Sequence, residues 1–264
     1  MNISCKIEAS VIEELTKKYP YSFLLSIDDS DTYLANMRKL LRMSKGSNGC
    51  LSGKTLMNAL FPQNPEFDVF ISHSHKDKGL AIFLRGYLKR YFGLNSFIDS
   101  MVWHNSYDFL KEFDECFCKM ENGNYDYEKR NFSTSNIFLM LANALSLMMD
   151  SCPIVVFIAS PNSLVQDNIS LELSNDTHSP WLFHELNTMQ LLRIKPLVGL
   201  IKESSERITA NLPKIEFNIP SVASLPLLTK EILEKHSILP DDKQKTVCSL
   251  CQQLLSNDVM RGSC

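Results

Sequence analysis

The feature that most constrains the fold is an apolar strand pattern that leads directly into a polar loop and then a helix. Phe67, Val69, Phe70 and Ile71 are aromatic or β-branched residues, which are typical of a buried strand. Six polar residues, 72–77, follow them, and the next apolar side chains repeat at helical spacing: Leu80, Phe83, Leu84, Tyr87, Leu88 and Tyr91. We expect residues 72–77 to line a ligand crevice at the carboxyl end of the strand, or else only to cap the helix.

Further strand patterns alternate with helical ones. Residues 96–99 form a short candidate strand that ends in a carboxylate, Asp99. Residues 153–159 (PIVVFIA) are an uninterrupted apolar run, which is typical of a parallel sheet covered on both faces. Residues 197–201 and 217–219 are weaker candidates. The alternation predicts an α/β fold with a parallel sheet flanked by helices.

The segments on either side of this region are predicted to be helical. The apolar side chains of Ile12 and Leu15 repeat at helical spacing near the N-terminus, and a further helical pattern ends before Pro62. We therefore predict an N-terminal helical extension (1–62), a sheet domain (66–220) and a C-terminal helical tail (221–264).

Two helices are predicted between the second and third strands. The first carries Leu110, Phe113 and Phe117 on one face, and a polar break at residues 121–135 is predicted to be an insertion. The second, residues 136–150, is apolar on nearly every side. Such a helix should be buried between layers or covered by a partner.

The composition is that of a soluble globular protein. The chain has 264 residues, 44% of them hydrophobic, and a net charge of −3, so it has no global basic field to attract nucleic acid or anionic membranes. No stretch approaches the roughly 18 uninterrupted apolar residues of a membrane span, and the N-terminus lacks the pattern of a signal peptide. We expect a cytoplasmic protein with no nucleic-acid or membrane partner.

The eight cysteines show no regular spacing, and we expect free thiols in a reducing compartment. Cys248 and Cys251 are spaced as in zinc and redox motifs. They also fall within a helical pattern with no second ligand pair at a useful distance, which favours burial as small apolar residues.

The second informative stretch is residues 179–186 (SPWLFHEL). Ser179 is a good N-cap and Pro180 suits the first helical position. Trp181 and Glu185 are four residues apart and share one helical face. Glu185 taken alone is typical of a solvated surface carboxylate. A carboxylate shielded by Trp181 could instead hold ribose hydroxyls and stabilise an oxocarbenium ion.

Trp103 lies in a loop after the second strand. A large aromatic side chain at such a place is either a ligand or partner contact, or it packs back onto the domain.

Three of these stretches together resemble the Toll/interleukin-1 receptor (TIR) domain family. Residues 68–74 resemble the opening strand of the family, residues 97–99 its second strand, and residues 179–186 its active-site helix. The similarity is to the bacterial branch in particular, many of whose members break NAD+ and act in defence against phage. It implies a flavodoxin-like fold over about residues 66–220.

The resemblance also implies roles for individual residues. Glu185 matches the family's catalytic glutamate, and Trp181 matches an aromatic residue found four positions before it. His73 and Ser74 occupy the loop that touches the nucleotide. Asp99 ends the second strand and Trp103 lies in the loop after it. Both are expected to contact the substrate, Trp103 in an element that often meets a neighbouring subunit.

The function expected from these features is NAD+ glycohydrolase or ADP-ribosyl cyclase activity, with NAD+ as substrate and no cofactor or metal. The product would be a signalling nucleotide sensed by a downstream effector, or NAD+ would simply be depleted. A non-catalytic adaptor that self-associates through its TIR domain is the main alternative, and a nucleoside-modifying enzyme is a third.

Overall fold

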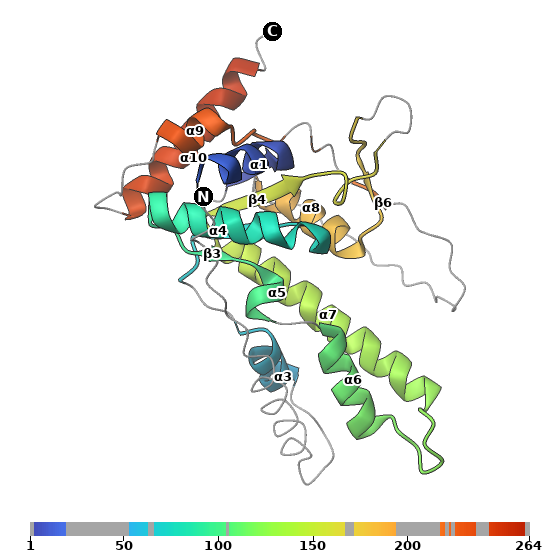
Figure 1. Cartoon of the computed structure of the whole chain (residues 1–264). Coiled ribbons are helices and arrows are strands. Elements are labelled where there is room, and N and C mark those ends of the chain that lie inside the picture. The colour runs from blue at the N-terminus through green and yellow to red at the C-terminus, as the bar shows by residue number, and fades with distance from the viewer. Residues whose placement is uncertain are drawn as a thin grey trace. The chain divides into compact units, whose positions relative to one another are not determined.

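The computed structural model describes residues 3–19, 53–62, 66–103, 106–166, 172–193, 217–219, 222, 225–235 and 243–261. The chain forms two compact units (Figure 1). The first unit combines residues 1–24, 67–96 and 152–264, and the second combines residues 25–66 and 97–151. Each unit is therefore built from segments that lie apart in the sequence.

The first unit is built on a parallel sheet with the strand order β1–β4–β2–β3. The strands are β1 (Ile3–Glu8), β2 (Val69–Ser72), β3 (Ser96–Phe97) and β4 (Ile154–Ala159). Ile154 at the start of β4 lies opposite Ile3 of β1 on one side and opposite Val69 of β2 on the other. All six side chains of β4 are buried, which explains the uninterrupted apolar run.

The predicted α/β class, a parallel sheet flanked by helices, is confirmed. Strands β2, β3 and β4 follow one another as the first three strands of a flavodoxin-like sheet do, with the first strand between the second and the third. The chain leaves β2 toward β3 on one side and reaches β4 on the other, so the strand order reverses between β2 and β4. Ligands of open α/β sheets bind outside the carboxyl ends of the strands at such a point.

Strand β1 corrects the prediction that residues 1–62 form a helical extension. Residues 3–8 pair along their whole length with β4, and they fill the sheet position next to it. Ile3, Cys5 and Ile7 alternate with polar residues, which is a strand period. In six residues, the strand period is too weak a signal to outweigh the helical pattern that follows it in the sequence. The pairing with β4 is what identifies residues 3–8 as a strand.

The helices of the first unit begin and end near the expected residues. α1 (Ala9–Lys18) buries Ile12 and Leu15 and packs on α4 (Lys78–Phe92). α4 ends at Gly93, whose φ of 69° suits a residue without a Cβ and whose N–H bonds back to the last turn. α8 (Pro180–Arg193) packs on β1, where the Ser4 hydroxyl donates to the Met189 carbonyl at 3.3 Å.

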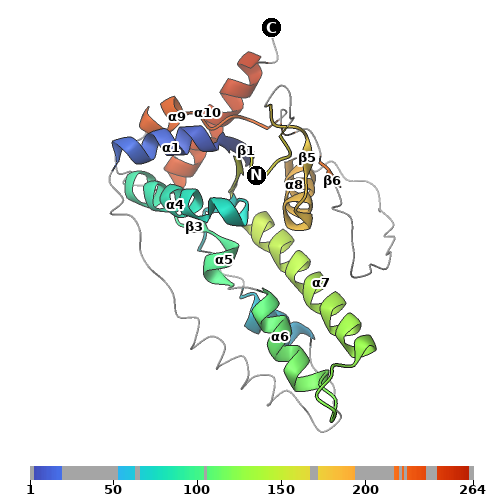
Figure 2. The same ribbon diagram turned by 45° about the vertical axis from the view of Figure 1, so that its right-hand side comes forward.

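A separate antiparallel ladder lies against α8 (Figure 2). It pairs β5 (Asp176–Thr177) with β6 (Phe217–Asn218). The predicted strand at residues 217–219 therefore exists, but it pairs with β5 and not within the parallel sheet. The predicted strand at residues 197–201 lies outside the described residues.

The predicted C-terminal helices are present as α9 (Lys230–Lys235) and α10 (Lys243–Arg261). α9 lies beside α1 in Figure 1, and two exposed ion pairs join them, Lys18 to Glu234 at 2.9 Å and Lys230 to Glu14 at 2.8 Å.

Residues 3–19 and 225–235, which the prediction assigned to an extension and a tail, lie in the same compact unit as the sheet.

The second unit contains four described helices. They are α3 (Gly53–Leu60), α5 (Asp99–Val102), α6 (Ser106–Phe117) and α7 (Tyr127–Ser151). α6 and α7 pack on each other, and α3 packs on α7. The polar break predicted at residues 121–135 is shorter than expected, because α7 already begins at Tyr127.

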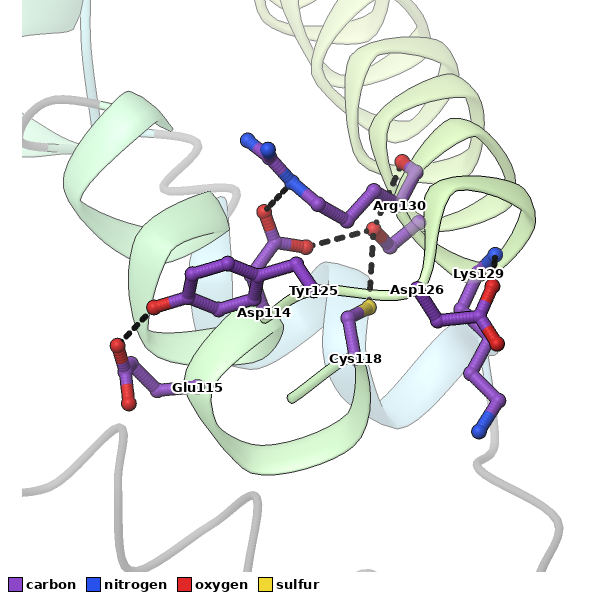
Figure 3. Close-up of polar contacts among 8 residues, drawn as sticks. Asp114, Glu115, Cys118, Tyr125, Asp126, Lys129 and Arg130 are labelled. Carbon is purple, nitrogen blue, oxygen red and sulfur yellow. Dashed lines mark hydrogen bonds and ion pairs between the residues drawn. The ribbon is translucent and has the colours of Figure 1, made fainter. Parts of the chain in front are cut away.

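A buried polar cluster joins α6 to α7 (Figure 3). The Asp114 carboxylate, 4% exposed, accepts hydrogen bonds from Arg130 Nε at 2.9 Å and from the Ser133 hydroxyl at 3.0 Å. Cys118 lies beside Ser133, and burial raises the pKa of its thiol. At the surface, the Tyr125 hydroxyl donates to Glu115. These contacts fix the pairing of the two helices with directional bonds.

Among the described helices, α7 alone has the length and apolar composition that a membrane crossing requires. Core helices of soluble proteins meet the same requirement, and α7 buries Ile137, Leu141 and Leu145.

Replacing Ile7 with Ala should lower the free energy of unfolding by about 2–5 kcal/mol, because it opens a cavity in the core that β1 shares with β4. Urea denaturation of wild type, Ile7→Ala and Glu13→Ala would measure this, with exposed Glu13 on α1 as the control that leaves the midpoint unchanged. An unchanged midpoint in Ile7→Ala would show that β1 is dispensable.

In the second unit, Asp114→Ala should cost about 1–3 kcal/mol, because it removes the buried acceptor of two hydrogen bonds. Lys119→Ala, which breaks only an exposed pair with Glu115, is the control and should change little. Hydrogen exchange of α6 and α7 amides would report both. Equal exchange in the two variants would contradict the role assigned to the polar cluster in holding α6 and α7 together.

Candidate active site

The helix that carries Glu185 begins as the sequence predicts. The Ser179 hydroxyl accepts a hydrogen bond from the Leu182 N–H at 3.3 Å, which is the N-cap contact, and Pro180 is the first residue of α8. Leu182, Leu186 and Met189 are buried on the core face. The register of α8, and with it the position of Glu185, is set by these local signals.

Glu185 lies against the last residue of β2. The Ser72 hydroxyl donates to Glu185 Oε2 at 2.5 Å, and both side chains are buried, at 1% and 4% exposure. The carboxylate therefore lies at the carboxyl end of β2, beside the point where the strand order reverses. A carboxylate has about four acceptor positions, and Ser72 uses one of them.

A second buried carboxylate, Asp77, follows the same loop. Its oxygens accept hydrogen bonds from the Ser160 hydroxyl at 2.5 Å and from the Asn162 amide at 2.7 Å. Ser160 directly follows β4, so these contacts join the loops after β2 and β4.

Sequence analysis placed Asp77 in the crevice loop but gave it no role, and it did not single out Ser160 or Asn162. Their position directly after an apolar parallel strand was the available signal.

The expected substrate contacts of the first unit are close in sequence either to Ser72 or to Glu185. His73 and Ser74 connect Ser72 to the 3-10 turn η1 (His75–Asp77), and both are partly exposed. Trp181 is partly exposed in the first turn of α8, one turn before Glu185.

Trp103 packs against other side chains of its own unit. It is 2% exposed, its indole N–H donates to the Pro62 carbonyl at 3.1 Å, and its ring meets those of Phe61 and Phe97 edge-on. Trp103 thus matches the packing alternative, because two phenyl rings and its hydrogen-bonded indole pack together there.

Asp99, the first residue of α5, is partly exposed and belongs to the same unit as Trp103. The predicted substrate-binding set is thus divided between the two units.

No cluster of three or more His, Cys, Asp or Glu side chains suited to a metal ion occurs within the described ranges. On α10, Cys248 is exposed while Cys251 is half-buried, and burial raises the pKa of the Cys251 thiol. Leu250 and Leu254 form the buried face of this helix.

Comparison of the chain with protein-family models, curated proteins and solved structures finds no match. The chemistry of the site therefore rests on its own geometry. A shielded carboxylate and a hydroxyl at the carboxyl end of a central strand can bind sugar hydroxyls and stabilise a neighbouring positive charge.

Ser72→Ala should lower the free energy of unfolding by about 1–3 kcal/mol, because it removes a donor from a buried carboxylate. Ser74→Ala is the matched control, since the Ser74 side chain makes no capping bond to η1 and is partly exposed. Thermal or urea unfolding would compare the two. A loss in Ser74→Ala as large as that in Ser72→Ala would contradict the role assigned to the Ser72–Glu185 bond.

Proposed function

We propose that this chain is an NAD+ glycohydrolase or ADP-ribosyl cyclase of the TIR type, with Glu185 as its catalytic residue. The observation that carries the proposal is the contact between Glu185 and Ser72 at the carboxyl end of β2. It supports the arrangement that the resemblance to TIR domains implies, in which the helix glutamate faces the loop after the first strand of the family pattern. The reversal of strand order between β2 and β4 supports the same location.

The proposed reaction breaks the bond between the ribose C1′ and the nicotinamide nitrogen. Nicotinamide leaves as a neutral molecule with the bonding electron pair, so no general acid is needed. The ribosyl group becomes an oxocarbenium ion, which the Glu185 carboxylate stabilises. Water adds to C1′ and loses a proton, giving ADP-ribose, or a nucleophile within the molecule adds and gives a cyclic product.

The remaining residues of the proposed site supply binding. His73 and Ser74, on the loop after β2, contact the nucleotide, and Trp181 shields the carboxylate from its place one turn before Glu185. Asp99 belongs to the second unit and is assigned no role in the proposed site of the first. We assign Trp103 no role in the proposed site, because its ring and indole N–H make packing contacts within the second unit.

The resemblance extends the proposal to a biological setting. We place the protein in the bacterial cytoplasm, in a defence response to phage, where it depletes NAD+ or makes a nucleotide that a downstream effector senses. Self-association through the sheet unit would assemble the active form.

Glu185→Gln should lower the rate of nicotinamide release from NAD+ by about 100-fold or more, since it removes the charge that stabilises the cation. Chromatography of nicotinamide would measure the rate over a series of protein concentrations, because TIR enzymes act in assemblies. Glu13→Gln, on the exposed face of α1, is the control. Turnover that survives in Glu185→Gln would remove the proposed mechanism.

The adaptor alternative has one observation in its favour. Phe132 and Leu139 on α7 are 74% and 56% exposed, and they are seven residues apart, on one helical face. If Phe132→Ser abolishes biological output while Glu185→Gln preserves it, association and not catalysis is the function.

A further inference from the structure

A series of polar side chains connects the loop after β2 to the start of the helix that carries Glu185. It begins at Asp77, which accepts the Ser160 hydroxyl. Ser160 and Ser163 then bond to each other within the turn after β4: the Ser160 N–H donates to Ser163 Oγ at 2.8 Å, and the Ser163 N–H donates to Ser160 Oγ at 3.1 Å. This turn is thereby tied to the beginning of α4.

Thr177 continues the series toward α8. Its hydroxyl donates to the Ser163 carbonyl at 2.8 Å and accepts the Ser179 N–H at 3.2 Å. Ser179 in turn caps the Leu182 N–H. A hydroxyl can donate in one direction and accept in another, so Thr177 links the turn after β4 to the N-cap of α8 through a single oxygen.

The series closes on itself through Glu185. Glu185 lies in the second turn of α8 and accepts the Ser72 hydroxyl, and Ser72 ends β2 five residues before Asp77. We define the polar ring as the residues Ser72, Asp77, Ser160, Ser163, Thr177, Ser179 and Glu185. All of them except Ser179 are at most 5% exposed, so solvent competes little for these bonds.

We propose that Thr177 is a positioning residue, which fixes where α8 begins and thereby holds the Glu185 carboxylate against Ser72. This inference rests on the proposed function, because it concerns the residue that would stabilise the ribosyl cation. A catalytic group misplaced by about 1 Å loses much of its effect, so a link that fixes the helix start affects the rate without touching the substrate.

The short β5–β6 ladder explains why a side chain is needed at this place. Thr177 pairs through its backbone with Phe217, so its own position is fixed by β6. The Thr177 hydroxyl accepts the Ser179 N–H and so fixes the N-cap of α8 relative to β6. The first turn of a helix contains backbone N–H groups without partners inside the helix, and Thr177 and Ser179 satisfy two N–H groups there.

Three substitutions separate positioning from general stability. Thr177→Val keeps the shape but removes the hydroxyl, and Thr177→Ser keeps the hydroxyl. Thr188→Val is the matched control, because Thr188 is also buried and its hydroxyl bonds along α8, to the His184 carbonyl at 2.8 Å.

We expect Thr177→Val to lower kcat for nicotinamide release by about 10–100-fold with little change in KM, since orientation and not binding is lost. Thr177→Ser should restore kcat to within about threefold, and Thr188→Val should leave it within about twofold. A kcat that falls equally in Thr177→Val and Thr188→Val would overturn the proposal.

Hydrogen exchange of the backbone amides of Ser179, Trp181 and Leu182 gives a second readout that needs no turnover. Exchange there should quicken about tenfold or more in Thr177→Val, while exchange in β4 stays unchanged. Unchanged exchange at these three amides overturns the proposal even if Glu185 proves catalytic. If Glu185→Gln keeps full turnover, the proposed function fails, and quicker exchange in Thr177→Val still supports Thr177 as the residue that fixes α8.

Should Thr177→Val fail to fold, Ser179→Ala breaks the next bond of the polar ring, and Ser179→Thr keeps it. The alanine variant should then show the quicker exchange and the lower kcat, and the threonine variant should show neither. Equal behaviour of the two would overturn the proposal.

Discussion

The pairing of β4 with a strand on each side is the constraint on which the first unit depends. β4 is buried over its whole length, so its backbone groups need partners on both edges and its side chains need apolar cover on both faces. β2 supplies one edge and β1 the other, although these strands lie more than sixty residues apart in the sequence. Without β1, the backbone groups on one edge of β4 would lack their hydrogen-bond partners.

The same arrangement brings the polar groups together. Parallel strands place their carboxyl ends at one edge of the sheet, so the loops after β2 and β4 are neighbours there. Buried polar groups at this edge require hydrogen-bond partners, and they find them in one another, from Asp77 through Thr177 to Glu185. Several loops together therefore fix the position of Glu185, because their polar groups are buried and hydrogen-bond to one another.

The second unit uses a different balance of forces. Its α6–α7 hairpin combines apolar packing with the buried Asp114 carboxylate, which binds groups from α7 on two sides. Trp103 fills the aromatic core of the unit and is held by its indole N–H. α7 nevertheless leaves Phe132 and Leu139 exposed, so its apolar character exceeds what the unit itself buries.

Local patterns were enough to predict the parallel α/β class, strands at residues 67–71 and 153–159, and the N-cap of α8, because periodicity and capping are local signals. Contacts between distant segments were needed to show that residues 3–8 form a strand, that Trp103 is buried, and that Glu185 meets Ser72. These three features depend on partners that are distant in sequence. The local sequence around a six-residue strand or a loop tryptophan does not indicate which distant residues will pack against it.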